Sequence, residues 1–317
     1  MAGSLAVDAG ILLAGIVLLY VGAELLVSAA SALALSHGVK AATVGVTVIA
    51  FATTAPELFV SSIGALTASD SIALGNIVGS NIANIGLVLG ASAVVRPMQV
   101  DDDTLYQHGP FMFVAAVALV GLGLDGRIGA GDGVVLLALL AGFTGFLYYK
   151  AQQNDVVIPE DVDMSADTTS AGVRDYVALV GSILLLLAGS RALIVGGRGV
   201  LVAWGFGDLF IGLTIIAFGT SVPELATSLV SAIRGEAQFS IGNVVGSNIY
   251  NVLAVIGVVA VVVPITVESA TVSYEFPIML GFTVVALAMM ALGDRITRIE
   301  GFGLLAGYVG FLYFLLP

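Results

Sequence analysis

Long apolar runs alternate with short polar or glycine-rich breaks along the whole chain. There are ten such runs, at about 8–32, 40–67, 71–95, 108–124, 131–150, 174–197, 207–233, 238–263, 272–292 and 299–316. Each can cross a hydrocarbon core about 30 Å thick, which takes roughly 20 helical residues. Because backbone polar groups in lipid must pair within the chain, these runs are expected to be helices. The pattern predicts an all-α membrane protein with ten transmembrane helices.

The runs are organised as two copies of one unit. The stretch GVTVIAFATTAPEL at 45–58 returns as GLTIIAFGTSVPEL at 212–225. At the same shift of 167 residues, GNIVGSNIANI at 75–85 returns as GNVVGSNIYNV at 242–252. Five runs separate each position from its copy, and because five is odd the second copy enters the membrane from the opposite side. The chain is therefore predicted to hold two five-helix repeats of inverted topology, a common plan in secondary transporters.

The polar stretch 151–173, which contains QQND and DTTS, is predicted to be an acidic cytoplasmic linker. Residues 1–150 then form the first five-helix repeat, with its alpha-1 motif at 44–95. Residues 174–317 form the second, with its alpha-2 motif at 211–262.

The positive-inside rule gives the orientation. If the N-terminus is outside, the inner loops hold Lys40, Arg96, Lys150, Arg174, Arg234, Arg295 and Arg298. The outer loops then hold only Arg127, Arg191 and Arg198. An external N-terminus is therefore predicted.

Composition supports a membrane location and excludes several classes. The chain is 59% hydrophobic and 10% charged, against roughly 25% charged in soluble domains. No basic segment precedes the first run, which is therefore expected to be a retained helix rather than a signal peptide. Without cysteine there is no disulfide or thiolate metal site. His37 and His108 lie near the ends of runs and are predicted to be solvated loop residues.

The charge balance is strongly acidic. Twenty-two acidic and ten basic residues give a net charge of −12, which excludes nucleic acid as a partner. The acids gather at Asp101–Asp103 and between Asp155 and Asp167. Neither run has the glycine-turned spacing of a calcium loop. They are interpreted as solvated surface of the kind expected in a salt-loving organism.

The first repeated motif places a carboxylate among hydroxyls. On a helix Thr53, Thr54 and Glu57 share one face, because they are three or four residues apart. Thr220, Ser221 and Glu224 repeat this arrangement. Pro56 and Pro223 lack an N–H group, so broken helices with free carbonyl oxygens are expected there, at an ion site near the midplane. Irregular backbone at that depth is tolerated where it lines a cavity.

The second repeated motif adds further oxygen ligands. Ser80 and Asn84 are four residues apart, as are Ser247 and Asn251. Bringing the repeats together would set Glu57 opposite Glu224. Carboxylate, hydroxyl and carbonyl oxygens suit calcium and could serve sodium, whereas zinc, copper and iron prefer softer ligands. A buried charge with no basic partner in its segment is costly, which favours a functional role for both glutamates.

These paired motifs, AFATTAPEL with GNIVGSNIAN and AFGTSVPEL with GNVVGSNIYN, resemble the two alpha-repeats of the cation/calcium exchanger superfamily. Within it, the chain is most similar to prokaryotic sodium/calcium exchangers. The resemblance covers essentially the whole chain. It implies a multi-pass cell-membrane protein that exports calcium by alternating access as sodium enters, commonly three sodium ions per calcium, so that transport is electrogenic. The two leading helices, near 1–36 and 168–204, would slide across a more fixed core.

The resemblance also implies ligands. Glu57 and Glu224 would bind calcium with the backbone oxygens of Thr53 and Thr220. Sodium sites would use Ala50, Thr53, Thr54, Ser80, Ala217, Thr220, Ser221 and Ser247. One position departs from the family, because many members carry aspartate where Asn251 stands, and this leaves potassium dependence and stoichiometry open.

Other functions remain as alternatives. A proton/calcium antiporter would use the same glutamates, although the neighbouring hydroxyls favour sodium. A divalent-cation channel is a more distant alternative, since a channel would not need closely matched inverted halves. No constellation suits an enzyme, because Asp132 in the string GAGD has no second buried aspartate and no Ser-His pair suits nucleophilic catalysis. No cofactor and no obligate protein partner are expected beside the transported ions and the lipid bilayer.

Overall fold

The computed structural model describes residues 2–67, 70–153, 172–204 and 219–315, and most of these residues are helical. The first half contains α1 (Ala2–His37), α2 (Ala41–Val44), η1 (Gly45–Ile49), α3 (Ala50–Thr67), α4 (Asp70–Ala83), η2 (Asn84–Leu89), α5 (Gly90–Val95), β1 (Met98–Gln99), η3 (Thr104–His108), α6 (Gly109–Gly123), β2 (Arg127–Ile128) and α7 (Ala130–Gln153). The second half contains α8 (Val173–Ala203), α11 (Val222–Arg234), α12 (Ala237–Tyr250), η5 (Asn251–Ile256), α13 (Gly257–Val262), β3 (Ile265–Thr266), η6 (Thr271–Glu275), α14 (Phe276–Leu292), β4 (Arg295–Ile296) and α15 (Arg298–Leu315). The η elements are π-helical turns that join α-helical pieces into longer rods.

Eight stretches of the described chain are long and apolar enough to cross a membrane. They are Leu5–His37, Ala41–Ile63, Ala73–Val95, Thr104–Gly123, Ala130–Lys150, Val173–Ala203, Ala237–Val262 and Thr271–Leu292. A further predicted run, 299–316, corresponds to α15. Only the C-terminal part of the run 207–233 lies within the described residues, as α11. Most of the predicted linker 151–173 lies outside them.

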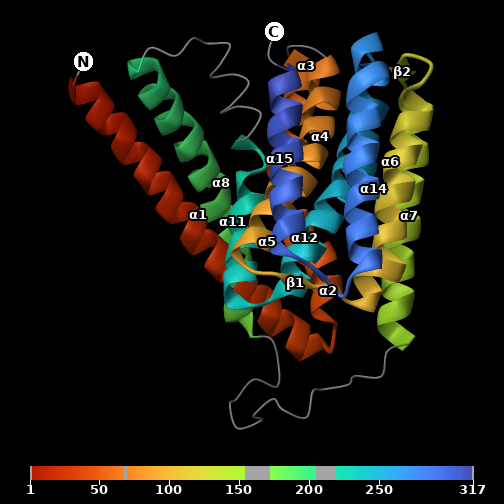
Figure 1. Ribbon diagram of the computed structural model, residues 1–317, viewed down its shortest axis with the longest axis horizontal. Helices are drawn as coiled ribbons and strands as arrows, with labels where there is room; N and C mark the ends of the chain where they lie inside the picture. The colour runs from red at the N-terminus through yellow and green to blue at the C-terminus, as the bar shows by residue number, and fades with distance from the viewer. Residues whose placement is uncertain (1, 68–69, 154–171, 205–218, 316–317) are drawn as a thin grey trace.

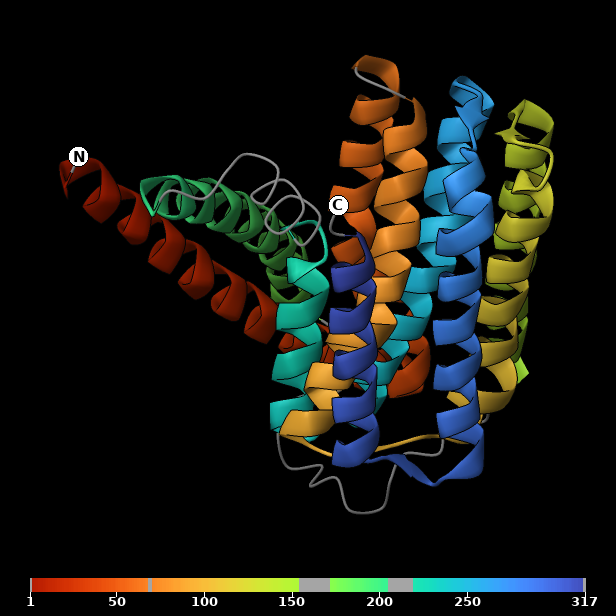
Figure 2. The same ribbon diagram turned by 45° about the horizontal axis from the view of Figure 1, so that its top comes forward.

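Helices α1 and α8 form a pair, and α1 also packs on α11 of the bundle through a smaller apolar cluster that includes Leu26, Ala30 and Val230. Helices α1 and α8 lie side by side, and their distance from the bundle increases toward the end of the molecule where the N-terminus lies (Figure 1, Figure 2). Glycine allows their backbones to meet, because a Cβ atom at Gly15 would lie 2.6 Å from the amide nitrogen of Leu193. Gly189 likewise faces the backbone of Leu19. Small residues at such positions permit close packing of membrane helices.

The remaining helices form an upright bundle with α12 at its centre. α12 packs against η1 and α3 of the first repeat and against α11 of its own. Every residue from Phe239 to Ile249 is buried. The largest hydrophobic core of the described residues surrounds it, with Ile77, Ile85 and Phe276 fully enclosed. The repeated motif therefore puts polar side chains at the centre of an apolar bundle.

Two short β-ribbons connect the repeats. β1 pairs antiparallel with β4, Met98 opposite Ile296, and β2 pairs with β3, Ile128 opposite Ile265. Each ribbon takes one strand from each half of the chain, and the labels of β1 and β2 stand at opposite ends of the bundle in Figure 1. All four of these apolar side chains are buried. The bundle is thus joined across the repeats at both ends.

The start of the fourth predicted helix differs from the sequence expectation. His37 is exposed as predicted, but His108 is 1% exposed, so its assignment to a solvated loop is wrong. The helix begins one turn earlier than the apolar run, because Asp101 accepts hydrogen bonds from the Thr104 amide (2.8 Å) and hydroxyl (2.7 Å). Asp103 is also largely buried and forms an ion pair with Lys40 at 2.5 Å. This acidic run therefore starts a helix and ties it to the turn after α1, rather than forming plain solvated surface.

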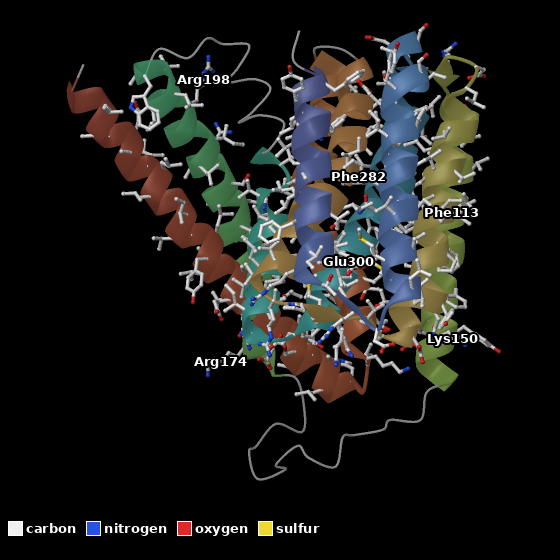
Figure 3. The ribbon with its side chains drawn as sticks, in the orientation of Figure 1. Phe113, Lys150, Arg174, Arg198, Phe282 and Glu300 are labelled. Carbon is white, nitrogen blue, oxygen red and sulfur yellow. The ribbon has the colours of Figure 1, made fainter. Side chains whose placement is uncertain are left out.

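Figure 3 shows where three basic residues lie along the helices. Lys150 near the end of α7 and Arg174 at the start of α8 lie at one end of the molecule, and Arg198 lies at the other. The orientation predicted from the sequence puts Lys150 and Arg174 on the inner side and Arg198 on the outer side, so it requires them to lie at opposite ends. Which end faces the cytoplasm stays a prediction.

Candidate functional site

The two repeated motifs meet inside the bundle. Helix α3 carries Thr53, Thr54 and Glu57; of their counterparts, Thr220 and Ser221 directly precede α11, and Glu224 lies in its first turn. α4 with η2, and α12 with η5, carry the Ser/Asn pairs. The described site residues are each at most 4% exposed: Ala50, Thr53, Thr54, Glu57, Ser80, Asn84, Thr220, Ser221, Glu224, Ser247 and Asn251. Ala217 lies outside the described residues.

Glu57 and Glu224 lie close enough for their charges to interact. Each approaches the threonine of the other repeat, Glu57 near Thr220 and Glu224 near Thr53. None of the four carboxylate oxygens has a hydrogen-bond partner among the described residues. Within the same part of the chain, no lysine or arginine forms an ion pair with either glutamate. Two such carboxylates in an apolar interior need positive charge or protons to be stable.

Further buried oxygens around the glutamates are also unpartnered in the described structure. These are the hydroxyls of Thr54, Ser80 and Ser221 and the amide oxygens of Asn84 and Asn251. A buried polar atom without a partner costs about 1–3 kcal/mol. A hard cation would satisfy many of them at once, because calcium takes 6–8 oxygen ligands. The described residues contain no group of three His, Cys, Asp or Glu side chains that could hold a metal, so any cation here depends on two carboxylates and neutral oxygens.

The sequence analysis did not single out Asn76 and Asn243, which are central to the structure. Thr53 donates to Asn243 Oδ1 at 3.0 Å, and Thr220 donates to Asn76 Oδ1 at 3.3 Å. Behind them, Asn243 Nδ2 donates to Ser228 at 3.0 Å, and Asn76 Nδ2 donates to Ser61 at 3.0 Å. These are the same contacts at a shift of 167 residues. The repetition of the dipeptide Gly-Asn in both motifs was the available signal.

Ser247 and Asn251 of the second repeat contact residues of the first repeat. Asn251 Nδ2 donates to Asn81 Oδ1 at 3.0 Å, and Asn81 Nδ2 lies 3.4 Å from the Asn248 carbonyl. The Ser247 hydroxyl lies 3.4 Å from Thr53 Oγ1. Neither amide atom of Asn84 has a partner among the described residues. The two halves of the site are therefore similar in sequence but differ in hydrogen bonding.

The two prolines act differently in the two repeats. α3 continues through Pro56, whose missing N–H leaves the Ala52 carbonyl without its helical donor. In the second repeat the chain bends at Thr220 and Ser221, and Pro223 stands in the first turn of α11. The Gly219 carbonyl accepts a hydrogen bond from Ser190 of α8 at 2.5 Å. The α1/α8 pair thus bonds directly to the backbone beside the site.

A second link joins α1 to the bundle. Arg234, at the end of α11, donates to Glu24 at 3.1 Å and to Ser28 at 2.8 Å, both on α1. Glu236 accepts from Arg234 at 3.0 Å and from Ser31 at 3.2 Å. Glu24 therefore forms an ion pair with Arg234 of the bundle. Arg191, its counterpart in the second repeat, is exposed on α8.

Known proteins of similar sequence match most of this chain. A family model described as sodium/calcium exchanger protein matches residues 7–149 and 175–316. The putative antiporter CaxA of Alkalimonas amylolytica is 34% identical over 96% of this chain and 97% of its own. The Ca(2+)/H(+) antiporter ChaA of Bacillus subtilis is 24% identical over 80% of this chain and 78% of its own.

Among solved structures, the sodium-calcium exchanger NCX_Mj soaked with 10 mM Na⁺ and 10 mM Sr²⁺ has a TM-score of 0.85 to this chain. It is 27% identical and covers 99% of this chain and 100% of its own. This likeness confirms the predicted fold class, a ten-helix membrane protein built from two inverted repeats.

Proposed function

The chain belongs to the sodium/calcium exchanger protein family, and on this premise we propose that it is a sodium/calcium antiporter that uses Glu57 and Glu224 to bind its ions. It is a secondary transporter rather than an enzyme. In the proposed cycle calcium leaves the cell as sodium enters, and the site opens alternately to the two sides of the membrane.

The observation that carries this proposal is the pair of buried glutamates, whose carboxylate oxygens have no partner among the described residues. Their combined charge of −2 equals the charge of one calcium ion in magnitude. The nearby unpartnered hydroxyl and amide oxygens complete a ligand set of the kind that calcium prefers. Three sodium ions would use subsets of the same oxygens and leave one net positive charge.

The residues proposed for ion binding follow the sequence prediction. Calcium would contact both glutamates and the backbone oxygens of Thr53 and Thr220. Sodium would also use hydroxyl and backbone oxygens from the following residues: Ala50, Thr53, Thr54, Ser80, Ala217, Thr220, Ser221 and Ser247. Asn84 and Asn251 would supply amide oxygens, both of which lack a partner in the described part of the chain.

The arrangement of the helices supports movement of α1 and α8 as one body. Their mutual packing is more extensive than their packing on the bundle, which consists in the described structure of a smaller apolar cluster and polar contacts that include Arg234 to Glu24 and Ser190 to Gly219. The bundle itself is joined across the repeats by two β-ribbons. Alternating access in such transporters commonly moves one group of helices against another around a fixed site.

Exchange of three sodium ions for one calcium would carry one net charge inward per cycle. An inside-negative potential of 100 mV would supply about 2.3 kcal/mol for that charge. The empty site would resist the switch, because two ionised glutamates without cations would have to cross an apolar barrier.

Proton/calcium antiport is the second candidate. It would need only the glutamates, since a proton requires no cage of oxygen ligands. The unpartnered hydroxyls of Thr54 and Ser221, one beside each glutamate, favour sodium instead.

Calcium uptake into proteoliposomes tests the proposal. Vesicles loaded with sodium are compared with vesicles loaded with potassium and with vesicles given a pH jump, each with the parent protein and with Glu57→Gln. We expect uptake that depends on the outward sodium gradient and is lost in the variant. Ser36→Ala serves as a matched control, because Ser36 lies at the end of α1 and its described hydrogen bonds go to Leu33 and His37 of the same helix.

Either of two results would overturn sodium coupling at this site. Uptake driven by the pH gradient and indifferent to sodium would assign the chain to the proton-coupled antiporters. Sodium-driven uptake that persists in Glu57→Gln would place the ion site elsewhere. Repeating the uptake at different membrane potentials, set with potassium gradients and valinomycin, tests whether net charge moves, and uptake unaffected by voltage would exclude electrogenic exchange.

A further inference from the structure

Asn76 and Asn243 occupy equivalent places behind the ion site. Each amide bridges a serine of its own repeat and a threonine of the other repeat. Asn243, Ser228 and Ser61 are fully buried. The two asparagines do not reach the glutamate carboxylates through any described hydrogen bond, but each contacts the threonine that lies beside one of them.

The direction of the hydrogen bonds at Asn243 follows from its neighbours. Its Nδ2 atom lies 3.3 Å from the backbone carbonyl of Glu224 and 3.0 Å from the Ser228 hydroxyl. A carbonyl can only accept, so the NH₂ group must point that way and Oδ1 must face Thr53. Because Oδ1 has no hydrogen, Thr53 is the donor in the 3.0 Å contact.

This direction determines what Thr53 offers to the site. A hydroxyl has one proton, and Asn243 takes it. The Ala50 carbonyl, 3.3 Å away, is a second acceptor for the same proton. Thr53 also lies within reach of Glu224, so Asn243 and the carboxylate compete for its one proton, and the bond to Asn243 leaves the Thr53 lone pairs for the site. Thr220 donates to Asn76 at 3.3 Å and is placed in the same way beside Glu57.

We propose that Asn76 and Asn243 are positioning residues that hold the hydroxyls of Thr220 and Thr53 as cation ligands. In this arrangement each asparagine competes with the neighbouring glutamate carboxylate for the one threonine proton, and the carboxylate is left to a bound metal cation. Without the asparagine the hydroxyl can turn and donate to the carboxylate, which would stabilise the empty site and weaken cation binding. The inference rests on the proposed function and adds a second layer of residues to its site.

Calcium titration calorimetry on the purified protein in sodium-free buffer tests this directly. Asn243→Ala is expected to weaken calcium binding roughly 10–100-fold, because the freed Thr53 hydroxyl can then donate to Glu224, a proposed calcium ligand; a loss of this size is usual when a residue that orients a metal site is removed. In a Thr53→Val background the same change is expected to cost less than about 2-fold, because no hydroxyl is left to orient. A Thr53→Ser background keeps the hydroxyl and should keep the sensitivity.

Ser228→Ala is the matched control. It removes a hydrogen bond from the far side of Asn243 and leaves the bond to the Glu224 carbonyl, so calcium affinity should change far less. Equal losses from Asn243→Ala in the parent protein and in the Thr53→Val background would overturn the inference, because a merely structural role does not depend on the hydroxyl.

The second repeat of the network provides an independent test if Asn243→Ala does not fold. The pair Asn76→Ala and Thr220→Val should show the same non-additivity. A parent protein that binds no calcium, or that binds it no more tightly than Glu57→Gln does, would overturn the proposed function together with this inference. A parent that binds calcium through Glu57 but shows additive losses in both cycles would overturn this inference alone.

Discussion

Asn251 donates a hydrogen bond from Nδ2 to Oδ1 of Asn81, with 3.0 Å between the two atoms. The contact joins the second repeat to the first and leaves Asn251 Oδ1 buried without a partner among the described residues. With an amide at this position, the described site residues carry two carboxylates, those of Glu57 and Glu224.

Asn251→Asp should shift the balance of ion binding toward sodium. The new carboxylate interacts with a total charge of +3 when three sodium ions are bound and of +2 when one calcium ion is bound. Asn81 would have to turn its amide to donate instead of accept. The measurement is the sodium concentration that displaces half of the bound ⁴⁵Ca, which we expect to fall. Asn251→Ala is the control without added charge, and a midpoint that rises in Asn251→Asp would contradict the charge argument.

Glu57→Gln should stabilise the ion-free protein while it removes calcium binding. A buried carboxylate without partners is unfavourable, and a neutral amide of similar shape relieves part of that cost, by about 1–3 kcal/mol. The melting temperature in calcium-free and sodium-free buffer should therefore rise. The parent should gain stability on addition of calcium, because a ligand that binds only the folded state stabilises it, and the variant should not. A variant that melts below the parent in the absence of ions would show that the carboxylate has a structural partner.

Arg234→Gln should loosen the attachment of α1 to the bundle. The ion pair to Glu24 is about one-third exposed, with side chains 30% and 35% accessible, and such pairs contribute about 0.2–1 kcal/mol. The chain has no cysteine, so Ala30→Cys, buried on α1, can be labelled with N-ethylmaleimide without background.

We expect labelling to become up to about 5-fold faster in Arg234→Gln and the difference to shrink in high salt. Arg127→Gln in the same cysteine background is the control. Labelling that is unchanged at low salt would mean that this ion pair does not limit the movement of α1.

Gly246→Ala should destabilise the protein, because α12 and the continuous helix formed by η1 and α3 approach each other closely there. An added Cβ atom would lie 2.5 Å from the Ala50 Cβ and 2.8 Å from the Val46 Cα. Overpacking of this kind costs about 1–3 kcal/mol, which thermal unfolding in detergent would measure. Gly145→Ala, on the exposed side of α7 with no described atom within 4 Å, is the matched control and should be neutral or slightly stabilising. Equal effects of the two changes would contradict the close approach.

The sequence was most informative where a pattern repeats. Hydropathy located the helices, and the repetition of the two motifs at one constant shift indicated that Glu57 and Glu224 come together. It could not show which side chains pair across the repeats, because the spacing along one helix says nothing about its neighbour. Asn76 and Asn243 were missed for this reason, although both stand within the quoted motifs.

Local sequence also misjudged helix ends. His108 was assigned to a loop because it stands at the edge of an apolar run, whereas the helix capped by Asp101, about two turns earlier, includes His108 and buries it. Pro56 was expected to break its helix, whereas α3 continues through it. In both cases neighbouring contacts in the folded chain outweigh the local preference of one residue.

The cross-repeat ribbons have a consequence for biogenesis. β1 follows the third apolar run, but its partner β4 is made only as synthesis approaches the last helix. Strand β1 therefore remains without its pairing partner until almost the whole chain has been synthesised. A ribosome-bound chain truncated before residue 295 would hold every ligand proposed for the ions and still lack the strand that closes one end of the bundle. Assembly of the transporter is thus completed when β4, between α14 and α15, pairs with β1, after every residue of the proposed ion site has been made.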